Sequence, residues 1–325
     1  MTAKPLDDLD PREYEHPFDA RALEALRGTP GLEPAARYLI KHAVERSVTI
    51  QYTGSNLRVT AETYPTVHAI LDKVCETIHL TNRPDLYIQW GYEINAFTIG
   101  VEHPIIVLMS GSVDLLEEAE LAWLVGHEVG HIKSRHTLYH LMARILPYLG
   151  DILGKATLGI GELLSAPLQL ALLRWSRMSE FTADRAGLLA CQDFGVTTRL
   201  MMKMAGMPIA HYHQANHEDF LRQAREFESL DYDTLNKAVK FLSIMTSTHP
   251  WTVLRAAELQ KWIASGEYDK VLLRQTTDRA FRRHDGANVF CRTCGWRLEG
   301  EEKFCPSCGT NLRNEPEGNG SPSSS

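Results

Sequence analysis

The sequence predicts a mainly helical protein with a small β-sheet and a short cysteine-rich module near the C-terminus. Apolar residues recur at the spacing of a helix over long stretches, for example between residues 64 and 78. Three short apolar runs, at residues 86–90, 96–99 and 105–109, have the length and composition of strands. Two C-x-x-C pairs follow residue 290. We therefore expect an α+β main domain and a small appended module.

The composition excludes several classes of function. The chain has 325 residues, of which 44% are hydrophobic, so it can bury one large core beside a small appendage. Its formal net charge of -7 provides no broad positive field for nucleic acid or anionic lipid. The start of the chain has no apolar signal-peptide core, and no apolar run is long enough to span a membrane. We expect a cytoplasmic protein.

The first half of the chain begins with polar, proline-containing sequence, so we expect residues 1–30 to form a loosely held arm. A main domain follows at residues 31–275. Its first elements are predicted as helix 32–47, strand 48–59, helix 64–78 and strands 86–90, 96–99 and 105–109. The strand at 48–59 depends on the partial alternation of Val48, Ile50 and Tyr52.

The second half of the domain is predicted to be helical. The expected elements are helix 117–134, an interrupted helical segment 138–173, a helix from about Arg177, and helices 197–204, 217–228, 232–246 and 251–265. Gly126 and Gly130 are four residues apart in helix 117–134, which predicts that another backbone packs closely against them. The apolar segment 138–173 leaves peripheral membrane contact open as an alternative.

The pentapeptide His127-Glu128-Val129-Gly130-His131 carries the main functional signal. Positions four apart share one face of a helix, so both imidazoles can reach a single metal ion. The carboxylate of Glu128 lies beside that face, where it can deprotonate a water bound to the metal. Composition alone would produce such a motif in about one of twenty chains of this length, so its surroundings decide its meaning.

A further acidic pair lies about fifty residues downstream. Glu180 and Asp184 are also four residues apart and share a helical face. A catalytic zinc needs three protein ligands and an open position for water. One of these carboxylates can supply the third ligand while the other accepts the N–H of a ligating imidazole. The alternative is a solvated acidic pair.

Together these residues resemble the gluzincin zinc metallopeptidases of the HtpX-like and CAAX prenyl protease family. H-E-V-G-H is followed by E-F-T-A-D-R-A-G, as in that family. Two shorter stretches also match, Asn95-Ala96-Phe97-Thr98 before the motif helix and Ser247-Thr248-His249-Pro250 with Arg255 after it. The resemblance runs from about residue 60 to 272.

The resemblance implies an α+β gluzincin core with His127, His131 and Glu180 as zinc ligands. It also implies Glu128 as general base and acid, and Asp184 as the partner of a ligand. Many members have membrane-spanning helices around the site. This sequence has none, which points to the soluble branch of the family.

Several further residues are candidates with open alternatives. His249 or Arg255 could stabilise the oxyanion from a loop, and His249 could equally be a fourth zinc ligand or a helix-capping residue. The strand at Asn95, Ala96 and Phe97 could bind an extended substrate at its edge, or be an ordinary sheet strand. The remaining histidines, His136 and His140 among them, are expected to be surface or packing residues.

The cysteine-rich module consists of two knuckles, Cys291–Cys294 and Cys305–Cys308, each followed by glycine. This spacing predicts a zinc ribbon at residues 290–310, with one structural zinc closed in by all four cysteines and a disulfide pair as the alternative. A linker at 276–289 precedes it and a disordered tail at 311–325 follows it. Its basic and acidic residues balance, so we expect a protein partner rather than nucleic acid. Cys75 and Cys191 are expected to be buried free thiols.

The sequence therefore predicts a zinc-dependent metalloendopeptidase that acts on polypeptides and holds one catalytic and one structural zinc. The alternative is a zinc-binding scaffold or chaperone-like adaptor whose protease site is latent. Glu128 disfavours this alternative, because an adaptor needs no general base. A third possibility, a nucleic-acid protein directed by the ribbon, is opposed by the charge balance and by the Glu180–Asp184 pair.

Overall fold

A computed structural model describes residues 3–27, 37, 45–144, 160–229, 252–273, 289–290 and 297–298 of the chain. It divides into two compact units, residues 1–274 and 275–325, which are described separately. The first unit contains α1 (Pro17–Arg27), α3 (Glu45–Ser55), β1 (Leu57–Arg58), α4 (Pro65–Thr77), β2 (Asp85–Gln89), β3 (Ala96–Ile99), β4 (Ile105–Met109), α5 (Ser110–Leu115), α6 (Glu118–Lys133), α8 (Ile160–Cys191), α9 (Phe194–Met204), α10 (His217–Ser229), α12 (Thr252–Ala264) and α13 (Glu267–Leu272). Residues 136–144 are helical as well.

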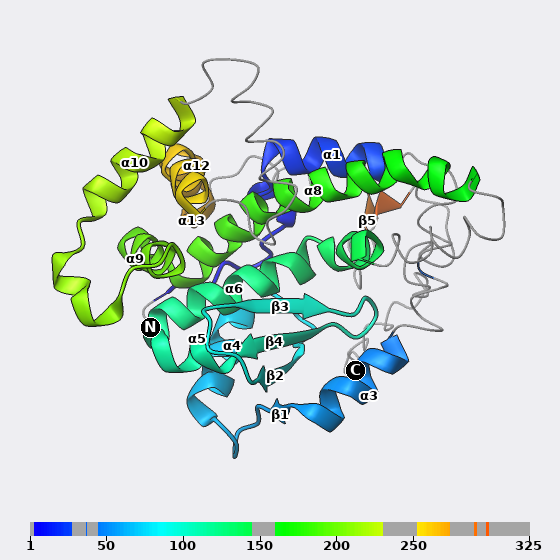
Figure 1. The fold of residues 1–325 in the computed structure, drawn as a ribbon, viewed down its shortest axis with the longest axis horizontal. Coiled ribbons are helices and arrows are strands. Elements are labelled where there is room, and N and C mark those ends of the chain that lie inside the picture. The colour runs from blue at the N-terminus through cyan, green and yellow to red at the C-terminus, as the bar shows by residue number, and fades with distance from the viewer. Residues whose placement is uncertain are drawn as a thin grey trace, which may run out of the picture. The chain divides into compact units, whose positions relative to one another are not determined.

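The four-stranded sheet has the order β1-β2-β4-β3 (Figure 1). Strands β2 and β4 run parallel, whereas β1 and β3 each pair with their neighbour in the antiparallel direction. Side chains alternate between the two faces, as strand geometry requires. Leu86, Ile106 and Leu108 face the main core, while Tyr87 and Val107 face a smaller cluster on the other side. Strand β3 is thus an edge strand within the described part of the sheet.

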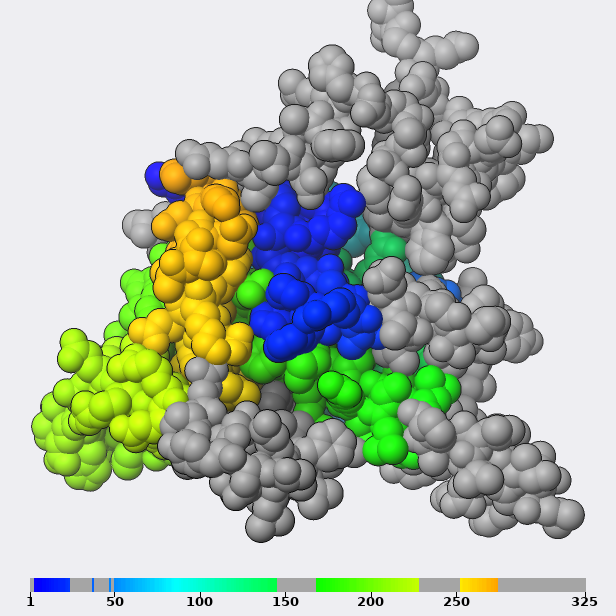
Figure 2. All heavy atoms as spheres, turned by 90° about the horizontal axis from the view of Figure 1, so that it is seen from above, coloured from blue at the N-terminus to red at the C-terminus, as the bar shows by residue number. Residues whose placement is uncertain are grey.

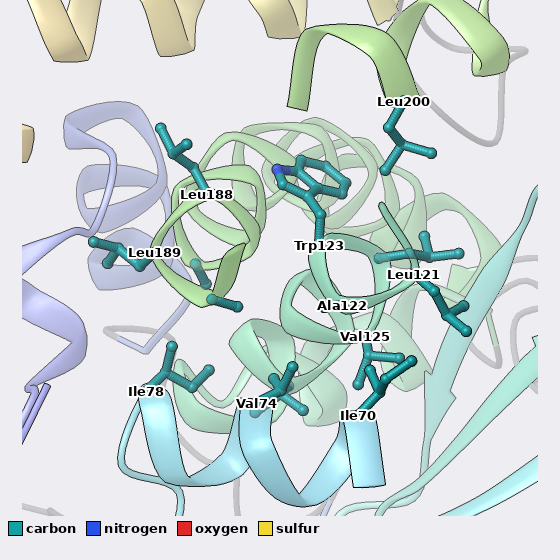
Figure 3. Packing of buried hydrophobic residues seen from close by; sticks show 14 of the residues in the cluster. Ile70, Val74, Ile78, Leu121, Ala122, Trp123, Val125, Leu188, Leu189 and Leu200 are labelled. Carbon is teal, nitrogen blue, oxygen red and sulfur yellow. The ribbon is translucent and has the colours of Figure 1, made fainter. Parts of the chain in front are cut away.

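Helix α6 is the centre of the main core. Figure 1 shows it between the sheet and α8, and every residue from 120 to 131 is buried. In Figure 3 side chains of α4 reach toward α6 from below, and Leu200 of α9 reaches toward Trp123 of α6 from above. The helix begins with a capping box between Glu117 and Glu120. Buried Glu120 also binds Arg199 and Lys203 of α9, which fixes this end of α6.

The two glycines of α6 lie against α8, which confirms the predicted close packing. A Cβ at Gly126 would come within 2.3 Å of the Cβ of Ala190, and one at Gly130 within 2.4 Å of the Cβ of Ala186. Only glycine therefore allows α6 and α8 to approach this closely. The approach brings the histidines of one helix to the carboxylates of the other.

The N-terminal segment is packed against the domain, which corrects the expectation of a loosely held arm. Leu6, Leu9 and Tyr14 are buried in the main core. Helix α1 lies along α8 (Figure 1), and in Figure 2 the N-terminal atoms adjoin those of α8, α12 and α13. The polar composition of this segment concealed a few well-placed apolar residues that supply its burial.

Two further predictions are wrong. Residues 48–55 belong to helix α3 rather than a strand, and only Leu57 and Arg58 pair with the sheet. The helix expected from about Arg177 is the end of α8, which begins at Ile160 and continues through Pro167. From residue 168 onward α8 packs Leu172 and Trp175 against the helix at 136–144, and this burial stabilises the long helix.

The predicted helices at 64–78, 117–134, 197–204, 217–228 and 251–265 and the three strands at 86–90, 96–99 and 105–109 agree with the structure to within a few residues. Residues 145–159 of the segment predicted at 138–173, residues 276–288 of the linker and the tail at 311–325 lie outside the described residues. Cys75 is buried and Cys191 half-buried, both as free thiols. Most of the helix predicted at 32–47, all of that at 232–246, and the four ribbon cysteines lie outside the described residues. In the second unit β5 (Val289–Phe290) pairs with β6 (Arg297–Leu298) in the antiparallel direction. Among the described residues, no helix has the length and hydropathy needed to cross a membrane.

Candidate metal centre

Helices α6 and α8 bring His127, His131 and Glu180 together. The Nε2 atoms of the two imidazoles are 3.2 Å apart. Glu180 places Oε2 3.5 Å from His127 Nε2 and Oε1 3.4 Å from His131 Nε2. The three side chains are buried, and their ligand atoms all lie within 4.8 Å of one another.

These separations fit a zinc ion. Zinc holds nitrogen and oxygen ligands tetrahedrally at about 2.0–2.1 Å, so neighbouring ligand atoms should be about 3.3 Å apart. Two neutral imidazoles and one carboxylate also form a donor set that catalytic zinc uses. Asp184 and Glu128 bring two more carboxylates into this buried region, and a divalent cation complements that charge.

His127 is held from behind by a charged pair. Its Nδ1 lies 3.0 Å from Oδ1 of Asp184, which is itself bound through both carboxylate oxygens by Arg255. Burial alone lowers the pKa of His127, but the hydrogen bonds with Asp184 and Glu180 outweigh it and raise the pKa to about 9. The Arg255 charge conversely holds the pKa of Asp184 below its usual value against the effect of burial.

His131 has different surroundings. Its Nδ1 lies 2.9 Å from Nδ1 of His136, and the ring of His140 packs edge-on against it. Burial is the main cause that lowers the pKa of His131, with the nearby His127 and His136 adding to it. His131, His136 and His140 also form a second group whose ligand atoms lie close together. His136 and His140, which were expected to be surface or packing residues, therefore both pack against the predicted zinc ligand His131.

Glu128 is positioned by the sheet. The hydroxyl of Thr98, on β3, donates to Oε2 of Glu128 at 2.7 Å. Glu128 itself is buried, one residue after His127 on α6. The edge strand and the carboxylate that follows the first histidine are therefore in direct contact.

The predicted substrate segment lies at the start of that edge strand. Asn95 precedes β3; its backbone carbonyl accepts from the backbone N–H of Met109, and its backbone N–H and carbonyl both bond with the hydroxyl of Ser112. Ala96 is buried toward the core, while Phe97 points to the opposite face, where it contacts Tyr52. The segment is placed beside the motif helix as expected, and its role in binding stays a prediction.

Arg255 reaches the site from a helix rather than the expected loop. It lies in the first turn of α12, is almost fully buried, and directs its guanidinium at Asp184 and Glu180. A role in oxyanion stabilisation stays a prediction, because its hydrogen bonds go to side chains of the centre. His249, the alternative candidate, lies outside the described residues.

Three side chains were not predicted from the sequence to act at the centre: Thr98 and His136, which contact Glu128 and His131, and Asp19, which contacts His136. Thr98 could have been found, because it belongs to the quoted Asn-Ala-Phe-Thr stretch. His136 follows the motif by five residues, which was a weak local signal. Asp19 had no signal in the sequence, since it meets His136 only through the packing of α1 on α8.

Comparison with known proteins places the site in context. Residues 61–263 match the family described as Peptidase family M48. A relative named Plastoglobule-localized metallopeptidase 48, chloroplastic, from Arabidopsis thaliana is 33% identical over 270 residues, which cover 82% of this chain and 77% of the relative. No solved structure has a significant match to the chain.

Two bacterial relatives carry the name HtpX. Protease HtpX of Legionella pneumophila is 26% identical over 231 residues, covering 62% of this chain and 78% of the relative. A protein named Protease HtpX homolog from Salinibacter ruber is 24% identical over 260 residues, covering 73% of this chain and 90% of the relative. The matches extend over most of the first unit.

Proposed function

This chain belongs to peptidase family M48 and is a zinc metallopeptidase, and we propose that His127, His131 and Glu180 hold its catalytic zinc while Glu128 is the general base. The observation that carries the proposal is the convergence of the three ligand atoms on α6 and α8 at separations that suit zinc. We assign the roles of Asp184 and Arg255 to holding His127 and Glu180 in place.

When bound, zinc lowers the pKa of water to about 7 and polarises the carbonyl of the substrate. Glu128 takes the proton of the attacking water and passes it to the leaving amine. Thr98 donates to Oε2 of Glu128, so we assign Oε1 as the atom that accepts the proton. Asp184 accepts the Nδ1 proton of His127 and thereby keeps Nε2 of that ring available to the metal.

The polypeptide substrate is proposed to add to the free edge of β3. That strand pairs with β4 on one side only, within the described residues, and its Thr98 touches Glu128. An extended chain bound there through main-chain hydrogen bonds would pass directly beside the general base. Such binding selects weakly on sequence.

Replacement of the general base tests this function. We expect Glu128→Gln to bind zinc as wild type does, yet to hydrolyse casein about 100-fold more slowly or worse, because general base catalysis is lost. Wild type should also lose activity with a chelator. Glu118→Gln, an exposed change on the same helix, is the matched control and should leave activity unchanged.

Equal hydrolysis of casein by Glu128→Gln and wild type would contradict the mechanism. It would favour instead a scaffold or chaperone-like adaptor with a latent protease site. Loss of zinc from Glu128→Gln would show that the residue acts on the metal rather than on the proton.

We also propose a second, structural zinc held by Cys291, Cys294, Cys305 and Cys308, with the ribbon as a docking module for a protein partner. Two zinc ions per chain are expected by elemental analysis. The double change Cys305→Ala/Cys308→Ala should reduce this to one while casein hydrolysis persists. Two zinc ions in that variant would contradict the ribbon.

A cytoplasmic location with peripheral membrane contact remains our proposal for the chain. The name of the Arabidopsis relative assigns that protein to plastoglobules and the chloroplast. Fractionation of cells that express the tagged chain tests this proposal. We expect the chain in the soluble fraction, and any part of it in the membrane fraction to be released by washing with salt.

A further inference from the structure

Of the two ring nitrogens of His131, Nδ1 points away from the metal centre. Since Nε2 of His131 faces His127 and Glu180, its Nδ1 is left for His136, 2.9 Å away. A neutral ring that offers Nε2 to a metal carries its proton on Nδ1 and donates it to the acceptor there. His136 then accepts at Nδ1 and carries its own proton on Nε2. That atom lies 3.0 Å from Oδ2 of Asp19.

The carboxylate of Asp19 is held in place beside the Nε2–H of His136. The residue is fully buried, and its carboxylate accepts hydrogen bonds from Nε1 of Trp175 at 2.8 Å and from the hydroxyl of Thr182 at 2.6 Å. Burial alone would raise the pKa of Asp19, but His136 and these hydrogen bonds hold it below its ordinary value. A buried carboxylate with this many partners is a fixed acceptor for His136.

A second metal ion is the competing explanation for the group of His131, His136 and His140. The ring nitrogens argue against it. Nδ1 and Nε2 of His140 already meet the hydroxyls of Ser176 and Ser179, at 3.2 and 2.9 Å. Both nitrogens of His136 are engaged as well, one by His131 and one by Asp19. Although these ring nitrogens lie close together, each of them already has another partner: His131 Nδ1 meets His136, His136 Nε2 lies at ion-pair distance from Asp19, and both nitrogens of His140 meet serine hydroxyls.

We propose that Asp19, acting through His136, is a positioning residue for the metal ligand His131. The inference rests on the proposed catalytic zinc site. It assigns a part in that site to α1, which precedes the 61–263 stretch matched by the family. Because partners that orient a ligating imidazole raise its affinity for metal, loss of Asp19 should weaken zinc binding although Asp19 touches no ligand directly.

The test is the zinc dissociation constant of the full-length chain, measured by competition with a chromogenic chelator. We expect Asp19→Asn, which preserves volume but replaces one accepting carboxylate oxygen by an amide nitrogen, to weaken zinc binding at the catalytic site by about 10-fold. His136→Leu should weaken it by as much or more. His136→Gln should largely rescue it, because an amide can accept from His131 and donate to Asp19.

Tyr14→Phe is the matched control. It removes another buried hydrogen bond of the same N-terminal segment, between the hydroxyls of Tyr14 and Ser134 at 3.1 Å, without touching His136. Its zinc affinity should equal that of wild type. With casein as substrate, Asp19→Asn should lower kcat at saturating zinc with little change in KM, and the visible spectrum of its cobalt form should shift, whereas Tyr14→Phe should change neither.

Three outcomes overturn the inference. Zinc affinity of Asp19→Asn equal to that of Tyr14→Phe would reduce Asp19 to a structural residue. Equal zinc affinity of His136→Leu and His136→Gln would show that the contacts from His131 through His136 to Asp19 do not support the metal ligand. This pair of variants decides the question if Asp19→Asn does not fold. A third zinc ion per wild-type chain that His136→Leu removes would instead establish the second metal site. If wild type binds no zinc at His127 and His131, the proposed function itself fails.

Discussion

The two histidines of the motif look equivalent in the sequence but have different surroundings in the fold. His127 is backed directly by Asp184, and Arg255 locks that carboxylate in place. His131 is backed by another neutral ring, His136, and meets a carboxylate only at the next step, in Asp19. The first arrangement uses α8 and α12, and the second adds the N-terminal helix α1.

This difference explains the opposite electrostatics of the two rings. A carboxylate in direct contact raises the pKa of His127 to about 9, whereas burial beside other imidazoles lowers the pKa of His131. A motif therefore fixes which atoms meet the metal, while the packing of distant segments fixes how each ligand is held. Substitutions can therefore affect the support of one histidine and not the other, or the close contact of α6 and α8 that places both.

The largest expected effect comes from breaking the charged pair behind His127. Arg255→Met should lower the free energy of unfolding by about 3–5 kcal/mol, because it leaves the buried carboxylate of Asp184 without its cation. Arg222→Met is the control, since Arg222 forms an exposed ion pair with Asp219 on α10. There we expect a change of about 1 kcal/mol or less in urea denaturation.

A loss in Arg255→Met no greater than in Arg222→Met would show that the Asp184–Arg255 pair contributes little to the fold. His127 would then need another source of support.

Proton release on zinc binding gives the second effect. Below about pH 9 the metal-free His127 is protonated, since its pKa is raised, and zinc must displace that proton. Zinc affinity should therefore fall about tenfold per pH unit as the pH drops from about 8 to about 6. Calorimetry at about pH 7 on Cys305→Ala/Cys308→Ala, in buffers of different ionisation enthalpy, should show about one proton released when zinc binds the catalytic site.

In Asp184→Asn the proton release at about pH 8 should decrease, because the hydrogen bond that most raises the pKa of His127 is weakened. Binding heats that do not depend on the buffer in wild type would contradict the assignment of a protonated His127.

The smallest effect concerns the frame that both histidines share. Gly130→Ala should destabilise the protein by about 1–3 kcal/mol, because the new Cβ would overlap that of Ala186 on α8. Adding Ala186→Gly should restore part of the loss. Gly54→Ala, which has no heavy atom within 4 Å of the new Cβ, is the control for an unobstructed glycine. A harmless Gly130→Ala, measured by thermal unfolding, would rule out the close contact of α6 and α8.

Local patterns predicted the parts of the molecule that depend on local order. Helix α6, helix α4 and strands β2, β3 and β4 appear where their periodicity placed them. Residues 48–55 failed because a short apolar alternation does not distinguish a strand from one side of a helix. The segment 138–173 was predicted to be interrupted, but α8 continues through Pro167, and burial of Leu172 and Trp175 further along supports the helix.

The site shows the same division. His127, His131, Glu180 and Asp184 were predictable because spacing of four residues puts side chains on one helical face. Asp19 could not be predicted, because it lies far from His136 in the chain and meets it only after α1 packs on α8. Long-range packing of this kind has no signature in a single sequence.

Anomalous diffraction at the zinc edge from crystals of the zinc-loaded chain tests the central claim most directly. We predict a peak about 2.0–2.2 Å from Nε2 of His127, Nε2 of His131 and a carboxylate oxygen of Glu180, with Nδ1 of His131 still on His136. A peak held by His136 and His140, or none between α6 and α8, would contradict the account.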